Sequence, residues 1–223
     1  MSVGRGRLGL AVGSFALFAL SGFVGLAVRD GARPLRVDNV AARIVDSAKL
    51  ETLLTAAQGQ HLRSHAFLEV MTSSGLPAAA AFVAVGLAVI AWRRGDQRGL
   101  ALCWLGPPIA VVLADVVAKP VVGRHRHGGL SYPSGHATGA AAVAVLVLLL
   151  LYRWGGSRAL LRVGPLALAL PLLMGLALVR SGWHYPTDVV GGVAMGAATM
   201  LALAAAIGFR EPGPDSSLGT PSA

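Results

Sequence analysis

The sequence predicts an all-α polytopic membrane protein in which six transmembrane helices form one bundle. Hydrophobic residues make up 55% of the 223 residues and charged residues only 13%, whereas roughly 25% are charged in an average soluble domain. The mean hydropathy is +0.66. The apolar residues also fall in long blocks, and a bilayer-spanning helix needs about 17 to 25 such residues. These values exclude a disordered chain and disfavour a soluble globular enzyme.

Six apolar runs are long enough to be spans, and residues 1–210 are predicted to form a single membrane domain. Glycine and proline inside the runs are compatible with spans, because neighbouring helices satisfy the backbone groups that they free. The first run could instead be a cleaved signal peptide, but it is long for one and no small-residue cleavage site precedes Arg29. The predicted spans cover residues 8–28, 76–92, 100–118, 135–152, 163–179 and 189–209.

Basic residues predict the orientation of these spans. Arginines precede the first span and follow the second and fourth, so the positive-inside rule places both termini in the cytoplasm. The expected location is the cell (plasma) membrane. Residues 37–70 then lie outside, where helical spacing of apolar residues predicts an amphipathic helix on the membrane surface or packed on the protein. Residues 211–223 are rich in Pro, Gly and Ser, which predicts a disordered cytoplasmic tail.

The net charge of +9 comes from 19 Lys and Arg against 10 Asp and Glu. In a soluble chain this excess would suggest nucleic acid as a partner. Here the basic residues flank apolar blocks, so membrane topology and an anionic substrate explain them better, and no nucleic-acid partner is expected. Cys103 is the only cysteine, which excludes an internal disulfide and a cysteine-based metal cage.

The first of three polar segments at outer span ends reads KPVVGRHRH. Its Lys119, Arg124 and Arg126 form a cationic cluster suited to phosphate, which arginine binds through a fork and lysine as a point charge. Interfacial snorkelling by basic side chains is the alternative. Asp115 lies one helical turn before Lys119, which predicts an ion pair between them.

The second segment, YPSGH, stands where the fourth predicted span begins. Pro133 and Ser134 suit a helix start. The backbone N–H groups of Ser134, Gly135 and His136 would point outwards and form an anion site reinforced by the helix dipole. The segment therefore predicts an anion site with His136 beside it, although capping alone would also explain Ser-Gly before a helix.

The third segment, RSGWHYPTD, contains His184 and Asp188, four residues apart. On a helical turn this spacing places both side chains on one face. A carboxylate bonded to one imidazole nitrogen leaves the other nitrogen as a nucleophile or base. A structural His–Asp pair at a helix start is the alternative for these two residues alone.

In this order and spacing, the segments resemble the signature of the type 2 phosphatidic acid phosphatase (PAP2) family. That signature has Lys, six residues and Arg-Pro, then Pro-Ser-Gly-His, then Ser-Arg, five residues, His, three residues and Asp. The resemblance implies a PAP2-like helical bundle and a metal-independent phosphatase that needs no cofactor. It implies that His184, oriented by Asp188, is the nucleophile and that His136 is the general acid. The implied phosphate ligands are Lys119, Arg126, Ser134, Gly135 and Arg180.

Two positions depart from the family pattern. His127 replaces the proline after Arg126, which is expected to change loop stiffness because proline fixes φ. Leu178 stands where the family has arginine. Arg180, two residues later, is expected to take that role through an irregular path that Gly182 makes plausible.

The function implied by the resemblance is hydrolysis of a lipid phosphate or diphosphate at the outer membrane face through a phosphohistidine. Phosphatidic acid, phosphatidylglycerol phosphate and undecaprenyl diphosphate all present such a phosphate at the interface. A lipid phosphotransferase is one alternative. The other is a non-catalytic PAP2-like protein that binds or transports an anionic lipid. Related haloperoxidases are soluble, which this composition disfavours.

Overall fold

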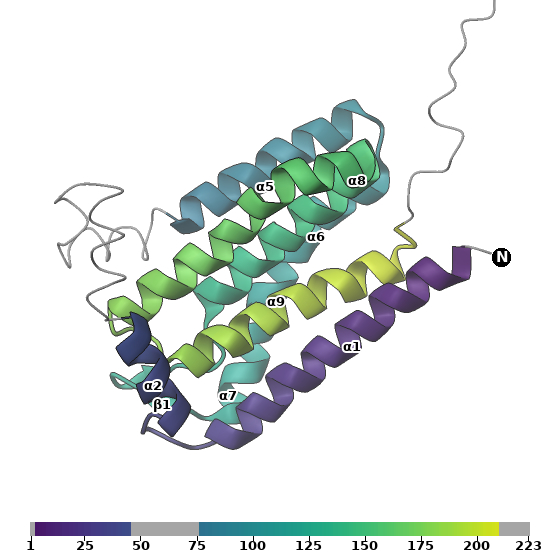
Figure 1. The fold of residues 1–223 in the computed structure, drawn as a ribbon. Helices are drawn as coiled ribbons and strands as arrows, with labels where there is room; N and C mark the ends of the chain where they lie inside the picture. The colour runs from purple at the N-terminus through teal and green to yellow at the C-terminus, as the bar shows by residue number, and fades with distance from the viewer. Residues whose placement is uncertain (1–2, 46–75, 210–223) are drawn as a thin grey trace, which may run out of the picture.

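The computed structural model describes residues 3–45 and 76–209, which are almost entirely helical (Figure 1). Most of the predicted outer segment 37–70 and the predicted tail 211–223 lie outside these residues. The helices are α1 (Val3–Val28), α2 (Arg36–Val45), α5 (Leu76–Arg93), α6 (Gln97–Val112), the π-helix η3 (Leu113–Ala118), α7 (Lys119–Val122), α8 (Gly135–Arg180) and α9 (Pro186–Ala206). Two short antiparallel strands, β1 (His125–Arg126) and β2 (Gly129–Leu130), connect α7 to α8.

Four helices are long and apolar enough to cross a membrane, namely Gly6–Val28, Gln97–Val122, Gly135–Arg180 and Pro186–Ala206. A shorter apolar helix, Ala78–Arg93, lies within α5. The predicted class of a helical, multi-pass membrane protein is therefore confirmed.

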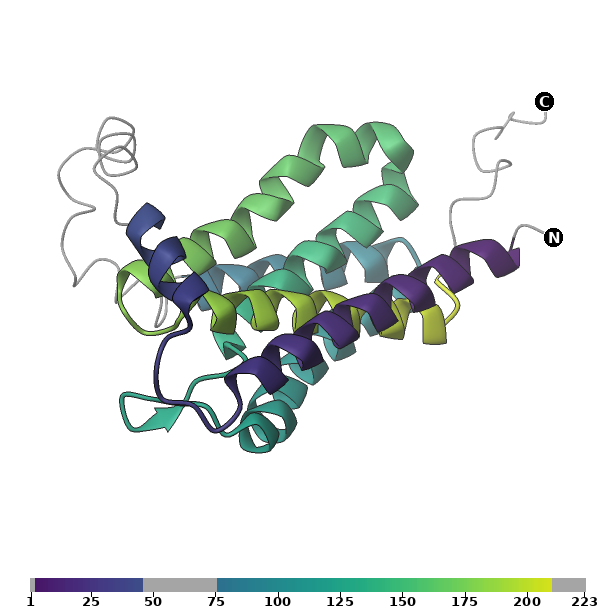
Figure 2. The same cartoon turned by 60° about the horizontal axis from the view of Figure 1, so that its bottom comes forward.

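Helix α8 contains both the fourth and the fifth predicted spans. At 46 residues it would extend for about 69 Å if straight, more than twice the roughly 30 Å of a bilayer core. Gly156 interrupts it with a φ of 63° and a ψ of −163°, and the chain turns back there (Figure 2). The predicted turn over residues 153–162 is therefore too long, because the chain is helical on both sides of Gly156.

Small residues bring the first turns of α8 against α9. A Cβ at Gly192 would lie 2.5 Å from the Ser134 carbonyl oxygen, and one at Gly196 would overlap the backbone of Thr138. Glycine at these positions allows two helix backbones to approach closely. On the other side of α9, Ser14 of α1 donates a hydrogen bond to the Ala198 carbonyl at 2.9 Å. Helix α9 is thus packed between α1 and α8.

The arginine-rich turns and the polar motif segments lie at opposite ends of the bundle. At one end, Asp96 accepts hydrogen bonds from Arg153 at 2.7 Å and from Trp154 at 3.0 Å, and Arg98 donates to the Gly208 carbonyl at 2.8 Å. At the other end, α2, α7 and the strands gather beside the first turn of α9 (Figure 1).

Helix α2 turns its polar side towards the protein. Asp38 is only 1% exposed, whereas Val37, Val40 and Ile44 are 50–64% exposed. The described part of the outer segment is therefore an amphipathic helix with an outward apolar face, as expected of a helix at a membrane surface.

Candidate active site

A tight hairpin carries the first motif from α7 to α8. Gly123 ends α7 in the left-handed conformation, with a φ of 65°. His127 and Gly128 form the two-residue turn between β1 and β2, with φ values of 50° and 80°, and two positive φ angles are typical of type I′ hairpin turns. Proline, with φ near −65°, could not occupy position 127. Histidine at position 127 therefore permits a turn that proline would not.

A cavity of about 480 Å³ brings together four of the predicted site residues, Lys119, Arg126, His136 and His184. They come from α7, β1, α8 and the connection before α9. Two histidines and two cations therefore share one polar cavity, as the motif spacing led us to expect. The cavity is also lined by residues that were not predicted to contribute, namely His127, Gly129, Leu130, Ser131, Ser181 and Trp183.

His184 lies against Asp188, but the two are not on one helical turn. Helix α9 begins at Pro186, so the prediction of a shared helix face is wrong. Asp188 instead reaches back from the first turn, and its Oδ2 accepts a hydrogen bond from the Tyr185 N–H at 3.0 Å. The same Oδ2 lies 3.4 Å from His184 Nδ1. This distance is longer than a good hydrogen bond.

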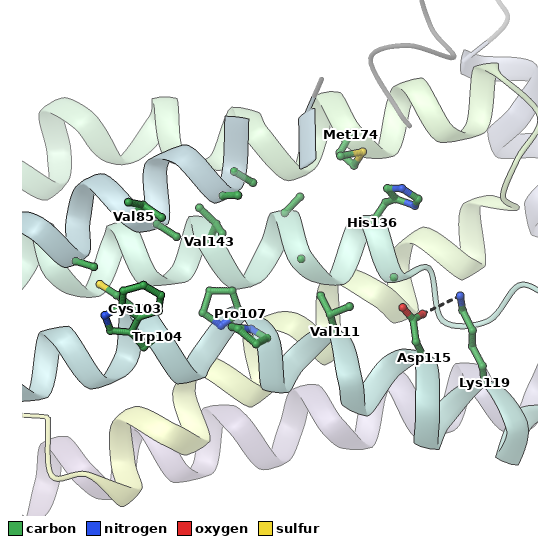
Figure 3. A pocket seen from close by; sticks show the side chains of 18 residues that line it. Val85, Cys103, Trp104, Pro107, Val111, Asp115, Lys119, His136, Val143 and Met174 are labelled. Carbon is green, nitrogen blue, oxygen red and sulfur yellow. Dashed lines mark ion pairs between the residues drawn. The ribbon is translucent and has the colours of Figure 1, made fainter. Parts of the chain in front are cut away.

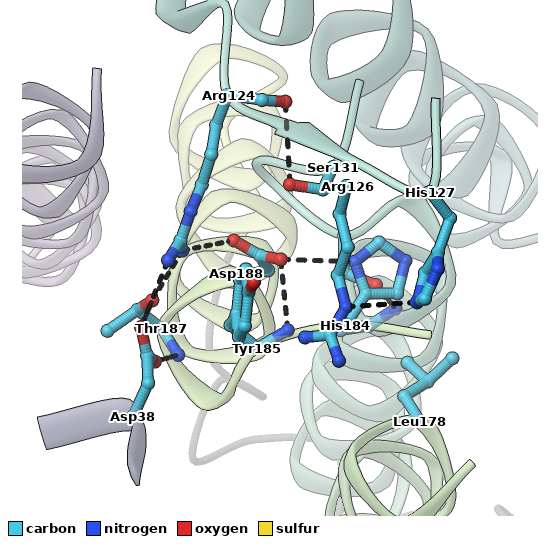
Figure 4. Close-up of polar contacts among 12 residues, drawn as sticks. Asp38, Arg124, Arg126, His127, Ser131, Leu178, His184, Tyr185, Thr187 and Asp188 are labelled. Carbon is cyan, nitrogen blue, oxygen red and sulfur yellow. Dashed lines mark hydrogen bonds and ion pairs between the residues drawn. The ribbon is translucent and has the colours of Figure 1, made fainter. Parts of the chain in front are cut away.

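Arg124 is buried on the side of Asp188 away from His184 (Figure 4) and is not among the residues that line the cavity. Its Nη1 donates to Asp188 Oδ1 at 2.6 Å and to Thr187 Oγ1 at 2.7 Å. Its Nη2 donates to Asp38 Oδ2 at 3.0 Å. The predicted place of Arg124 in a phosphate-binding cluster is therefore corrected, because its guanidinium neutralises buried carboxylates.

Asp38 completes this buried cluster, and sequence reasoning missed it. Its carboxylate accepts hydrogen bonds from the N–H groups of Thr187 and Leu35, each at 2.9 Å. Burial raises the pKa of Asp38, but the hydrogen bonds from Thr187, Leu35 and Arg124 outweigh burial and hold it below the ordinary value of 3.8. Asp38 and Arg124 are 86 positions apart, so no local pattern could have linked them.

Tyr185 supports both arginines of the first motif. The guanidinium carbon of Arg126 lies 3.8 Å from the centroid of its ring, and that of Arg124 lies 4.3 Å from the same centroid. Such cation–π contacts restrict a flexible side chain. Stacking on Tyr185 therefore holds Arg126 at the cavity.

Ser134 caps α8, as its place in the second motif predicts. Its Oγ accepts a long, 3.4 Å hydrogen bond from the Ala137 N–H, and its own N–H donates to the Asp188 carbonyl at 3.0 Å. The expected anion site therefore has fewer than the three predicted N–H groups, because the Ser134 N–H already donates to the Asp188 carbonyl. The N–H groups of Gly135 and His136 have no acceptor among the described residues.

A second cavity, of about 570 Å³ and mostly apolar lining, runs between α5, α6 and α8 (Figure 3). Lys119 and His136 line both cavities. Lys119 forms the predicted ion pair with Asp115 at 2.8 Å. A Cβ at Gly135 would lie 2.7 Å from an Asp115 oxygen, so glycine is needed where this pair meets α8.

Arg180 ends α8 and is not among the residues that line either cavity. Leu178, at the family's arginine position, is fully buried, and its carbonyl accepts from the N–H groups of Trp183 and His184 at 3.1 and 3.3 Å. Gly182 has a φ of 73°, so the path after Arg180 is irregular, as expected. The role of Arg180 as a phosphate ligand stays a prediction.

Comparison with known proteins agrees with the motif resemblance. Residues 117–211 match the family model described as the PAP2 superfamily. The structure is similar to the crystal structure of a transmembrane PAP2-type phosphatidylglycerolphosphate phosphatase from Bacillus subtilis. The TM-score is 0.55 and the identity 19%, and the match covers 85% of this chain and 93% of that chain. None of the curated proteins compared with the chain matches its sequence.

The part of the chain that carries the three motifs therefore matches the PAP2 superfamily model. The structural match shows a shared membrane fold beyond that part.

Proposed function

We propose that the protein is an integral membrane phosphatase that hydrolyses a lipid phosphate or diphosphate through a phosphohistidine on His184. The observation that carries this proposal is one polar cavity lined by Lys119, Arg126, His136 and His184, which shares Lys119 and His136 with an apolar cavity. The PAP2 match and the fold shared with a phosphatidylglycerolphosphate phosphatase support it.

In the first chemical step, Nε2 of His184 attacks phosphorus in line, because Nδ1 faces Asp188. The P–N bond forms as the bond from phosphorus to the leaving oxygen breaks. His136 donates its proton to that oxygen, which leaves as an alcohol or a phosphate. Covalent catalysis and general acid catalysis are thereby combined.

In the second step, water replaces the enzyme at phosphorus. His136, now neutral, accepts a proton from the attacking water. The P–N bond breaks, inorganic phosphate leaves, and His184 is neutral again for the next turnover. An acceptor other than water in this step would make the protein a phosphotransferase.

Fixed cations would stabilise the phosphoryl oxygens during both steps. Lys119 and Arg126 line the cavity, and the N–H groups of Gly135 and His136 lie at the start of α8, where a helix favours anions. Ser134 is proposed to contribute through this helix start. Arg180, next to the cavity residue Ser181, is proposed as a further phosphate contact at the rim, with a smaller contribution than Arg126.

We propose that this chemistry needs no metal ion or other cofactor. Lys119 and Arg126 would neutralise the charge that a divalent ion neutralises in metal-dependent phosphatases. Among residues 3–45 and 76–209, no three or more His, Cys, Asp or Glu side chains are grouped as metal ligands.

The apolar cavity supports a lipid as the substrate. It extends from Asp115, Lys119 and His136 past Pro107 to Trp104 between three apolar helices (Figure 3). A hydrocarbon chain lying there would have its phosphate beside Lys119 and His136. The class of substrate proposed is therefore a phosphate or diphosphate monoester of a long-chain alcohol or diacylglycerol.

We further propose six spans, with each arm of α8 counted separately, and an active site on the outer face of the plasma membrane. The arginines at the opposite end of the bundle support this orientation by the positive-inside rule. After Cys103→Ser, Gly128→Cys in intact cells should react with an impermeant thiol reagent and Gly156→Cys should not. The reverse labelling pattern would invert the proposed topology.

Phosphate release by the purified protein in detergent micelles tests the proposed activity. The panel comprises phosphatidic acid, phosphatidylglycerol phosphate and a polyprenyl diphosphate, with His184→Ala as the inactive control. Release by the wild type alone supports a phosphatase. Binding of these lipids without release, or transfer of phosphate to another acceptor, would favour the non-catalytic or the phosphotransferase alternative.

A further inference from the structure

We propose that Asp38 is a positioning residue that holds His184 in place through Arg124 and Asp188. Its carboxylate also keeps the net charge behind the His184 imidazole negative. This inference rests on the proposed role of His184 as the nucleophile. Asp38 belongs to none of the three motif segments and comes from the outer helix α2.

The four side chains form a continuous series (Figure 4). Asp38 Oδ2 lies 3.0 Å from Arg124 Nη2, and Arg124 Nη1 lies 2.6 Å from Asp188 Oδ1. Asp188 Oδ2 then lies 3.4 Å from His184 Nδ1. The side chains of Asp38, Arg124 and Asp188 are at most 1% exposed, so solvent and salt screen their interactions weakly.

Asp38 also accepts hydrogen bonds from the first turn of α9. Its Oδ1 accepts a hydrogen bond from the Thr187 N–H at 2.9 Å, and its Oδ2 accepts one from Thr187 Oγ1 at 3.1 Å. Thr187 directly precedes Asp188, so the same carboxylate restrains both the backbone and the ion pair of that aspartate. Helix α2 is thereby tied to the residue that orients His184.

The balance of charge in this cluster favours a positively charged imidazole. Two carboxylates, Asp38 and Asp188, face one guanidinium, that of Arg124, which leaves one net negative charge. Positive charge develops on His184 as the P–N bond forms. Without the charge of Asp38, the remaining ion pair of Arg124 and Asp188 is neutral, and the imidazolium loses this stabilisation.

The other groups around His184 do not replace Asp38, because most are cationic or neutral, and Asp115 is already paired with Lys119. The connections before β1 and before α9 and the first turn of α9 contribute Arg124, Tyr185 and Asp188, of which Asp188 lies against the imidazole. From η3, α7, the β-hairpin and α8, the charged or titratable groups near the cavity are Asp115, Lys119, Arg126, His127 and His136.

The first test compares the pH dependence of kcat/KM for the wild type, Asp38→Asn and Asp38→Glu in detergent micelles. Asp38→Asn should lower kcat on the order of 10- to 100-fold, the range known for partners that orient metal ligands, with a smaller change in KM. The acidic limb of its profile should move to lower pH, because a less stabilised imidazolium has a lower pKa. Asp38→Glu should keep the wild-type limb and part of the activity.

Asp30→Asn is the matched control, because it removes a carboxylate that is 76% exposed on the connection before α2. It should leave kcat and the limb unchanged. If Asp38→Asn does not fold, Asp38→Ser carries the same expectation in a smaller neutral side chain. A role of Asp38 in stability alone would lower the yield of folded protein without moving the limb, and that outcome would overturn the proposal.

A second readout does not depend on catalysis. The pKa of His184 is measured by ¹⁵N NMR titration of histidine-labelled protein in micelles, with His184→Gln for assignment. It should be lower in Asp38→Asn than in the wild type, and an equal pKa would overturn the proposal. If the wild type releases no phosphate, the proposed function is refuted. A lower pKa of His184 in Asp38→Asn would then still support the role of Asp38.

Discussion

Arg124→Met tests whether Arg124 stabilises the fold beneath the active site or binds phosphate. Methionine retains much of the apolar length but leaves the carboxylates of Asp38 and Asp188 buried without their cation. Removing one partner of a buried ion pair costs about 3–5 kcal/mol. A folded domain has a net stability of only about 5–15 kcal/mol. We therefore expect the variant to lose about a fifth or more of its free energy of unfolding.

The measurement is unfolding in detergent micelles at pH 7, with Arg29→Met as the matched control. The Arg29 side chain is 59% exposed and pairs with Asp30 at 3.4 Å, and surface pairs of this kind contribute about 0–1 kcal/mol. Near wild-type stability of Arg124→Met, together with loss of inorganic phosphate binding, would refute the structural role and restore Arg124 as a phosphate ligand.

Acidification should reduce the difference between Arg124→Met and the wild type. The pKa of Asp38 is held below its ordinary value of 3.8 in the folded protein. Its contribution to stability is therefore complete above that value and is lost as the pH falls through the lower folded pKa. A difference in stability that stays constant below pH 4 would contradict the assigned ion pairs.

Three further predictions concern the cavity. Activity should survive EDTA, since the proposed mechanism gives Lys119 and Arg126 the role of a divalent ion. Complete loss of activity that Mg²⁺ restores would contradict this. Arg126→Ala should lower kcat by about 10²–10³-fold. Arg180→Ala should lower kcat less, because Arg180 does not line the cavity. Equal losses of kcat in the two variants would indicate that both arginines contact the phosphate. His136→Ala should slow hydrolysis of an alkyl phosphate more than that of p-nitrophenyl phosphate, whose leaving group needs no proton. Equal slowing of both substrates would argue against a general acid.

The bundle and the meeting of the motifs could be predicted from the sequence because both depend on local patterns. Apolar runs identify membrane helices by length and hydropathy alone. Motifs at successive outer span ends must lie on one side of the membrane, so Lys119, His136 and His184 could be expected to converge. The cavity lined by these residues agrees with that expectation.

The pairing of Arg124 could not be predicted, because a phosphate ligand and a buried structural arginine have the same local sequence. Arg124 and Arg126 are two residues apart, yet only Arg126 lines the cavity. Their difference depends on Asp38, which a distant helix brings to Arg124. A contact between residues so far apart in the chain leaves no periodic signal.

The path of α8 was also mispredicted for a physical reason. Arg153, Arg158 and Arg162 suggested a polar turn between two spans, but long basic side chains on a helix can extend to the interface. All three arginines are therefore helical, with Arg153 before and Arg158 and Arg162 after the interruption at Gly156. A single residue, Gly156, reverses the chain with a positive φ that other residues rarely adopt.

Trapping a phosphoenzyme is the most direct test of the proposal that His184 is the nucleophile. The full-length protein in micelles is mixed with ³²P-labelled lipid phosphate and quenched in alkali within milliseconds, since phosphohistidine is stable to base and labile to acid. We predict a labelled wild-type protein whose label maps to His184, and no label in His184→Ala. Turnover by the wild type without any labelled protein, or equal labelling of His184→Ala, would contradict covalent catalysis by His184.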